Sequence, residues 1–177
     1  MFLIALALFA TTGRPSLVSA QSSIAPEYNV KAAFIYNFAK FVEWPDQQPE
    51  GPDDPFVLCV LGKGPVRNAF HELKDKRIKN REVDLWYNEE ITDPRQCKII
   101  YISASDAGRT AEVLAAVHGK SVLTIGEAPD FLRSGGIINF TAPGKKIRFE
   151  INLQEAVRVR LSISSQLLKL ADIREER

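Results

Sequence analysis

The stretch FVLCVLG, residues 56–62, is apolar without interruption and ends at a glycine. A continuous apolar run of this length predicts a strand that is buried on both faces. Two later runs have the same character, KIIYIS at residues 98–103 and SVLTIG at residues 121–126. Strands of this kind occur mainly in parallel sheets that helices cover on both sides. The three runs therefore predict the centre of an α/β fold.

The segments between these runs predict the helices that a parallel sheet requires. Residues 62–65 form a turn into a helix that ends near Lys74, and Asp106 is placed to cap a helix that runs to His118. REVDLWY, residues 81–87, alternates in polarity and predicts one more strand. We therefore expect an α/β fold with a mostly parallel sheet, flanked by helices on both faces.

The C-terminal part follows a different pattern. Pro143–Gly144 separates two strand-like runs, which predicts an antiparallel hairpin. Residues 154–171 then carry an apolar stripe at helical spacing and predict one long final helix, with Arg160 inside the stripe. Such an arginine either extends its charged end to the rim of the sheet or binds an anion. We expect residues 21–177 to form a single domain.

The segment from Glu27 to Trp44 predicts a helix that Pro45 ends. Its apolar arc is more than twice what a helix needs to cover one face of a sheet. Either this helix is wedged between two layers of its own domain, or part of it contacts another chain. Its aromatic side chains favour the second interpretation, because aromatic residues dominate the centres of interfaces. The predicted partner or dimer interface consists of Tyr36, Phe38, Phe41 and Trp44.

The first twenty residues have the character of a signal peptide. The apolar run MFLIALALFA is short for a membrane span and leads to Val18-Ser19-Ala20, which predicts cleavage after Ala20 and export. An uncleaved membrane anchor is the alternative. The chain has 23 basic and 22 acidic residues, and losing the leader removes only Arg14, which leaves 22 of each. A neutral chain without a basic run is a poor candidate for binding nucleic acid or an anionic membrane.

The chain has two cysteines, Cys59 and Cys97. In an exported protein an even number of cysteines favours a structural disulfide over two free thiols. A metal site is a weaker interpretation, because His71 and His118 lie far from both cysteines and lack the spacing of metal ligands. We expect no metal and no cofactor.

The ends of three predicted strands offer a candidate ligand crevice. In a doubly wound sheet, ligands usually bind beyond the carboxyl ends of the parallel strands. The residues placed there are Gly62, Lys63, Gly64, Ser103, Ser105 and Glu127. Ordinary caps and turns are the alternative interpretation. The chain lacks the G-x-S-x-G motif and a complete phosphate-binding loop, and neither histidine has a nucleophile beside it by motif. We therefore expect no enzymatic activity.

Three stretches carry a resemblance to a known family: EYNVKAAFIYNFAKFVEWP, SVLTIGEAPDFLRSGGIINF and KIRFEINLQEAVRVRLSISSQLLKLA. In type and order they resemble the YfiR family of bacterial periplasmic proteins, from about Pro26 to Leu170. The resemblance implies a periplasmic repressor that binds the periplasmic sensor portion of a YfiN-type membrane diguanylate cyclase and so lowers cyclic di-GMP signalling and biofilm. It also implies a homodimer and a second partner, an OmpA-like outer-membrane lipoprotein that sequesters the repressor.

The family's signature positions fall on particular residues of this chain. Beyond the first helix they are Gly126, Gly136, Phe140, Arg148, Phe149, Glu150, Asn152, Ser164, Ser165 and Leu168. Some members carry a second cysteine pair around the hairpin, and residues 139–146 contain no cysteine here. Redox switching through that pair is therefore excluded for this chain. The alternative function is a periplasmic sensor that binds a small ligand and acts on another membrane signalling partner.

Overall fold

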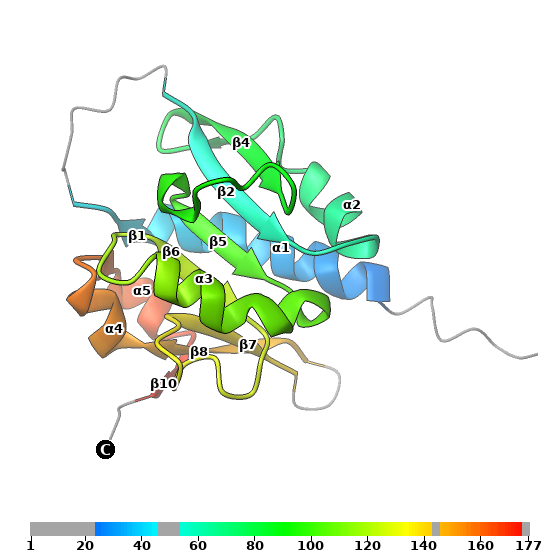
Figure 1. The fold of residues 1–177 in the computed structure, drawn as a ribbon. Helices are drawn as coiled ribbons and strands as arrows, with labels where there is room; N and C mark the ends of the chain where they lie inside the picture. Colours follow the sequence, from blue (N-terminus) through cyan, green and yellow to red (C-terminus); the bar gives the residue numbers. More distant parts are fainter. Residues whose placement is uncertain (1–23, 46–53, 143–145, 175–177) are drawn as a thin grey trace, which may run out of the picture.

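The structure is a computed structural model that describes residues 24–45, 54–142 and 146–174 (Figure 1). The predicted leader and the Pro143–Gly144 turn lie outside the described residues. The elements in chain order are α1 (Ile24–Phe41), β1 (Val42–Glu43), β2 (Phe56–Leu61), α2 (Pro65–His71), β3 (Arg77–Ile78), β4 (Arg81–Tyr87), η2 (Pro94–Gln96), β5 (Ile99–Ile102), η3 (Ala104–Arg109), α3 (Thr110–Ala116), β6 (Leu123–Gly126), β7 (Ile138–Thr141), β8 (Arg148–Asn152), α4 (Leu153–Arg158), β9 (Ser162–Ile163), α5 (Ser165–Leu168) and β10 (Asp172–Arg174).

The main sheet has eight strands in the order β10-β8-β7-β6-β5-β2-β4-β3. The five central strands, β7, β6, β5, β2 and β4, are parallel to one another. β8 runs antiparallel to β7, which confirms the predicted hairpin, and β10 adds a parallel edge strand beside β8. The expected α/β class with a mostly parallel sheet is therefore confirmed.

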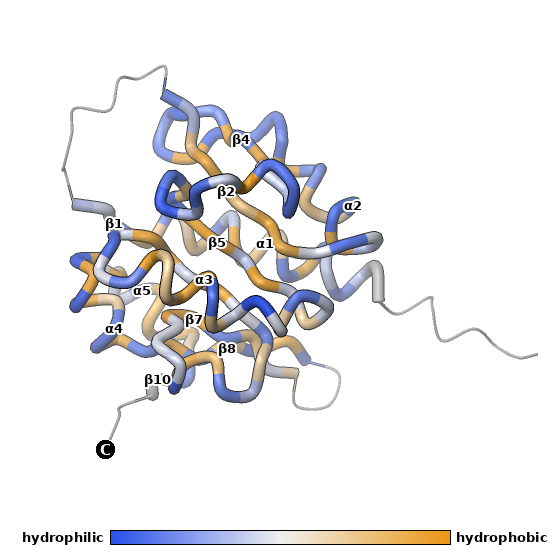
Figure 2. Tube along the Cα trace, in the orientation of Figure 1, coloured by the Kyte–Doolittle hydropathy of each residue, from blue (hydrophilic) through white to orange (hydrophobic). Residues whose placement is uncertain are grey.

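Helices cover both faces of this sheet, with α3 in front and α1 behind in the view of Figure 1. Alternate side chains of β2 point to opposite faces: Leu58 and Val60 join the core under α1 and α2, whereas Cys59 and Leu61 join the core under α3. The residues of β5 alternate in the same way. The strand interiors are accordingly hydrophobic in Figure 2, and the polar residues concentrate in the connections. Two cores explain why these strands are apolar on both sides.

The two cysteines form the predicted disulfide between β2 and the residue two positions before β5. Cys59 lies in β2, and the Cα atoms of Cys59 and Cys97 are 5.8 Å apart. Both half-cystines are buried in the core under α3. The disulfide therefore links β2 to the segment that leads into its parallel neighbour.

The prediction of one long final helix over residues 154–171 is wrong. The chain forms the short helices α4 and α5, with β9 between them, and ends in β10. Arg160 has a φ of 64°, in the left-handed region, which prevents α4 from continuing. Arg160 is exposed rather than part of a buried stripe, and Val157 is 65% exposed.

Two further boundaries differ from the prediction. The first helix ends at Phe41 rather than Trp44, because Val42–Glu43 pairs with Ser162–Ile163 as a small antiparallel sheet. Asp106 does not cap α3; it lies within η3 with non-helical backbone angles, and its carboxylate accepts hydrogen bonds from Asn88 and Ser105. No helix among the described residues has the length and hydropathy needed to cross a bilayer.

Candidate functional site

The carboxyl ends of β2 and β5 bring Gly62 and Ser103 together, as the sequence predicts. The Ser103 N–H donates a hydrogen bond of 2.9 Å to the Leu61 carbonyl, and a Cβ added at Gly62 would lie 3.0 Å from Ser103 Oγ. The closest contacts of such a Cβ would be with Val66 of α2, at 2.5 Å and 2.9 Å, so Gly62 must remain a glycine mainly for α2 to pack against the end of β2. Lys63 and Gly64 are exposed in the turn that starts α2.

The hydrogen-bonding groups at these strand ends are already engaged with one another. The Gly62 N–H donates to Asn88 Oδ1 at 2.9 Å, and Asn88 Nδ2 donates to Asp106 at 2.8 Å. Ser105 Oγ donates to the same carboxylate at 2.8 Å and lies 2.8 Å from Ser103 Oγ. The backbone donor that would bind an anion in a phosphate loop is thus occupied by Asn88. This network stabilises the loops and leaves Gly62 no free donor for a ligand.

Glu127, the remaining residue of the predicted crevice, accepts a hydrogen bond from the backbone of Ala104, between Ser103 and Ser105, and also contacts α1. Its carboxylate forms an ion pair of 2.9 Å with Lys31 of α1 and accepts a hydrogen bond from the Tyr101 hydroxyl. The side chains of Lys31 and Glu127 are only 4% and 9% exposed. Glu27, one turn before Lys31, forms a second ion pair with the same ammonium group. These contacts therefore anchor α1 to the end of β6.

Burial and pairing act in opposite directions on these two charges. Burial raises the pKa of Glu127 above its ordinary value, and the hydrogen bond and charge of Lys31 offset only part of that effect. Burial is the largest single effect on Lys31 and would lower its pKa, yet the hydrogen bonds and the charges of Glu27 and Glu127 together outweigh burial and raise that pKa. Lys31 was not among the site residues predicted from the sequence. Its place one turn after Glu27, within the apolar face of the helix, was the available indication.

The glycines of the central signature make room for one aromatic ring. Phe131 is fully buried, and a Cβ added at either Gly126 or Gly136 would lie less than 3.0 Å from its ring atoms. Two residues of the C-terminal signature are helix caps: Asn152 Oδ1 accepts from the Glu155 N–H at the start of α4, and Ser164 Oγ accepts from the Leu167 N–H at the start of α5. Arg148 and Ser165 are exposed, and Glu150 is half-buried. The glycines and both caps thus have structural explanations.

The aromatic end of α1 is partly internal. Phe38 is 1% exposed, and its ring centroid lies 4.7 Å from that of Phe149, so Phe38 belongs to the core of its own chain. Tyr36, Phe41 and Trp44 are half-buried. Trp44 packs edge-on against Phe56, with 5.4 Å between the ring centroids. Of the four residues predicted for an interface, Tyr36, Phe41 and Trp44 therefore reach the surface.

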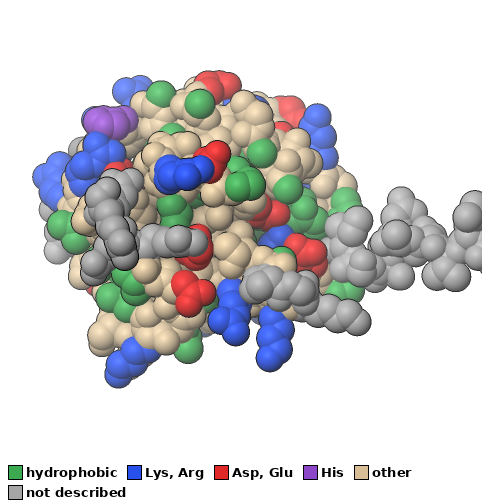
Figure 3. Space-filling view, turned by 90° about the horizontal axis from the view of Figure 1, so that it is seen from below, with side chains coloured by type: hydrophobic (Ala, Val, Ile, Leu, Met, Phe, Trp, Pro, Cys, Tyr) green, Lys and Arg blue, Asp and Glu red, His purple; other side chains and the backbone are tan. Residues whose placement is uncertain are grey.

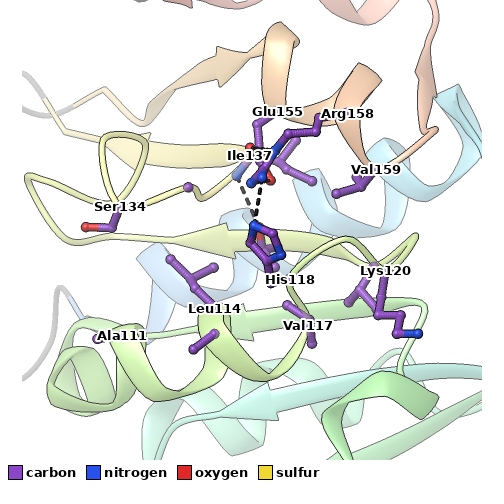
Figure 4. A pocket seen from close by; sticks show the side chains of 14 residues that line it. Ala111, Leu114, Val117, His118, Lys120, Ser134, Ile137, Glu155, Arg158 and Val159 are labelled. Carbon is purple, nitrogen blue, oxygen red and sulfur yellow. Dashed lines mark hydrogen bonds and ion pairs between the residues drawn. The ribbon is translucent and has the colours of Figure 1, made fainter.

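A cavity of about 240 Å³ lies between α3 and α4 (Figure 4). Its floor is mainly apolar and includes Leu114, Val117 and Ile137. At its mouth, Arg158 donates to Glu155 at 2.7 Å and 2.8 Å and contacts His118 Nε2 at 2.7 Å. Arg158 thus connects the two walls of the cavity, as the dashed lines in Figure 4 show.

The surface charge is mixed on the face seen in Figure 3. Basic and acidic side chains are interspersed across its coloured part, and the hydrophobic ones form small separate areas. Within the described residues, no three His, Cys, Asp or Glu side chains come together in a group that could hold a metal ion.

Comparison with known proteins gives one family and a broader likeness in fold. A family model described as YfiR/HmsC-like matches residues 28–172. A crystal structure of a conserved domain protein from Vibrio cholerae O1 biovar El Tor is similar over 84% of this chain, with 12% identity and a TM-score of 0.54. The ABC domain in complex with L-Trp from Streptococcus pneumonia is similar over 66% of this chain, with 11% identity and a TM-score of 0.46. This chain spans 60% and 54% of the lengths of those two proteins.

Proposed function

The chain belongs to the YfiR/HmsC-like family, and we propose that it is an exported regulator that binds the periplasmic sensor portion of a membrane diguanylate cyclase and represses it. The family match over residues 28–172 is the observation that carries this proposal. The disulfide between Cys59 and Cys97 is consistent with an oxidising compartment such as the periplasm. In this role the protein lowers cyclic di-GMP signalling through contact with a partner rather than through catalysis.

The strand ends support a role without catalysis. The hydroxyls of Ser103 and Ser105 contact each other, and Ser105 also donates to Asp106, so neither is paired with a histidine. His118 is engaged with Arg158 at the mouth of the cavity in Figure 4. A serine nucleophile is usually activated by a histidine within hydrogen-bond reach, and the contacts found for these two serines among the described residues include none.

The proposed partner surface is the C-terminal end of α1 with the small β1–β9 sheet. Tyr36, Phe41 and Trp44 present aromatic area there, and this type of residue contributes most to binding energy in interfaces. The surroundings of these side chains are fixed: the Tyr36 hydroxyl donates to the Arg77 carbonyl, and the Ser164 N–H donates to the Phe41 carbonyl. A surface held in this way loses little conformational entropy when a partner binds.

Sedimentation velocity of the mature protein tests the proposal, alone and with the periplasmic domain of a co-encoded membrane cyclase. We expect a hetero-complex that Trp44→Glu and Asn37→Arg each weaken by about tenfold or more, the loss of one interface anchor. Asn37 is an exposed residue of α1, one turn after Phe34 and one turn before Phe41. An arginine there adds bulk at the surface without disturbing the core. Val157→Glu, at an exposed position on α4, is the matched control and should bind like the wild type. A folded wild-type protein that forms no complex with the cyclase domain would refute repression by direct binding.

A further inference from the structure

A second cavity, of about 220 Å³, lies at the amino ends of β5 and β6. We call it the Trp44 cavity; its lining consists of Trp44, Pro45, residues 95–98, residues 119–122 and Arg160. It is at the opposite end of the parallel strands from Gly62 and Ser103. Because the polar groups at the carboxyl ends satisfy one another, the Trp44 cavity is the better candidate for a ligand site.

Basic side chains from four separate segments meet at the Trp44 cavity. Arg95 comes from η2, Lys98 from the start of β5, Lys120 from the connection to β6, and Arg160 from the turn after α4. No Asp or Glu is among the described residues that line it. A concave site lined by charges of one sign raises the local concentration of ions of the opposite sign. The cavity therefore has the electrostatic character of an anion site.

One acidic side chain close to the cavity is paired with a basic residue of the lining. Asp93 lies beside the lining and accepts hydrogen bonds from Arg95 at 2.8 Å and 2.9 Å. Its pKa is lowered by these hydrogen bonds and, to a smaller extent, by the charge of Lys120. Arg95 is thus already paired with Asp93, which offsets part of its charge, and Lys120 contributes the smallest of the effects on this carboxylate.

Trp44 forms part of the lining, and its indole Nε1–H has no hydrogen-bond partner among the described residues. The nitrogen atom itself is buried and does not face the open cavity. The ring therefore provides a wall of the cavity, and the basic side chains provide its anionic preference.

We propose that the Trp44 cavity binds a small solute through a phosphate or carboxylate group, with Arg95, Lys98, Lys120 and Arg160 supplying the positive charge. Guanidinium and ammonium groups are the usual ligands of such oxyanions, and charge-assisted hydrogen bonds are about twice as strong as neutral ones. Trp44 forms one wall of the cavity and also belongs to the proposed partner surface. Binding of the solute would then change the affinity for a partner, and binding of the partner would change the affinity for the solute by the same factor.

The fluorescence of Trp44 provides the assay, because the chain has only two tryptophans. Trp86→Phe leaves Trp44 as the single tryptophan. Inorganic phosphate and citrate serve as probes for the phosphate and carboxylate groups, each titrated at constant ionic strength against sodium chloride. Lys120→Gln and Arg95→Gln, at exposed positions, should each weaken binding about tenfold, the loss of roughly one charge-assisted hydrogen bond. Lys63→Gln, at the opposite end of the sheet, is the matched control.

We expect a saturable change in Trp44 fluorescence with phosphate, with citrate or with both, and the more effective probe identifies the chemical group. Isothermal titration of the wild-type protein should give the same affinity. If neither probe shows saturable binding up to about 10 mM, a concentration about tenfold above a millimolar dissociation constant, the proposal is overturned. Equal weakening by Lys63→Gln would overturn it as well. Because no partner is present, failure here would leave the proposed repressor function untouched, and failure of cyclase binding would leave the anion site untouched.

Discussion

The ring of Phe131 packs between Gly126 and Gly136. Replacing either glycine by alanine tests how much stability depends on this close contact. A Cβ added at Gly126 would lie 2.6 Å from Phe131 Cγ, and one at Gly136 would lie 2.8 Å from Cζ. Other atoms of the ring would lie closer still, and carbon atoms in contact prefer separations of roughly 3.5–4.0 Å, so the ring or a strand would have to move by roughly 1–2 Å. Overpacking of this kind costs about 1–3 kcal/mol. For a chain of this size, that loss lowers Tm by roughly 2–12 °C.

Thermal and urea unfolding, followed by circular dichroism, measure this loss. Gly108→Ala is the matched control, because Gly108 is exposed and nothing lies within 4 Å of a Cβ added there. Its replacement should change the free energy of unfolding by less than about 1 kcal/mol.

A double substitution tests the assigned cause. Phe131→Leu replaces the ring by a smaller, more adaptable side chain, so Gly126→Ala should cost clearly less in that background than in the wild type. The difference is the coupling energy between the two positions. Alanine variants as stable as the wild type, or a cost that persists unchanged in the Phe131→Leu background, would refute the packing explanation.

Three further predictions concern the disulfide, the buried ion pair and a helix cap. Replacing Cys59 and Cys97 by alanine should lower the free energy of unfolding by about 4 kcal/mol, because the bond closes a loop with a sequence separation of 38; an unchanged urea midpoint would contradict this. Lys31→Met should cost about 3–5 kcal/mol near pH 8, because it leaves the Glu127 carboxylate buried without its cation. The cost should be clearly smaller at acidic pH, because the raised pKa of Glu127 favours uptake of a proton there, and equal losses under both conditions would count against it. In the wild type, the raised pKa of Glu127 means that the folded protein binds this proton more tightly than the unfolded chain, so the contribution is present at low pH and is lost as the pH rises through the raised value; Glu127→Gln should remove that part of the pH profile. Asn152→Ala should cost about 1–2 kcal/mol in urea unfolding through loss of the α4 cap, and a loss below about 0.3 kcal/mol would show that water replaces the cap.

The centre of the fold was predictable because its strands carry their own signature. Each strand between two cores must place apolar side chains on both faces, and FVLCVLG does so with Leu58 on one side and Cys59 on the other. The final helix was mispredicted because a periodic apolar stripe does not reveal a long-range pairing. Ile163 pairs with Val42, which is far away in the sequence. To reach that pairing, the chain leaves the helix at Arg160, whose φ is in the left-handed region.

The candidate crevice shows a similar limit of prediction from the sequence. Topology places Gly62 and Ser103 together correctly, because carboxyl ends of adjacent parallel strands must meet. The sequence carries no indication that Asn88, from the loop after β4, occupies the Gly62 N–H. It also carries no indication that Glu127, which lies beside Ala104 at this edge, is paired with Lys31 of α1. The order of the strands was enough to predict that residues at their carboxyl ends lie near one another. It was not enough to predict which polar groups there pair, because that depends on the conformation of the loops.

The wide apolar arc of α1 has its explanation mainly inside the chain. The helix packs against the sheet through Phe38, contacts α2 and α5, and continues into β1, which pairs with β9. A helix covered on several sides needs a wide apolar arc even when no partner exists, so the width of the arc is no evidence for an interface. A partner surface is supported instead by the family and by the half-buried aromatic residues at the end of the helix. Trp44 is the most informative of these, because a change in its fluorescence can be followed for both the proposed partner and the proposed anion.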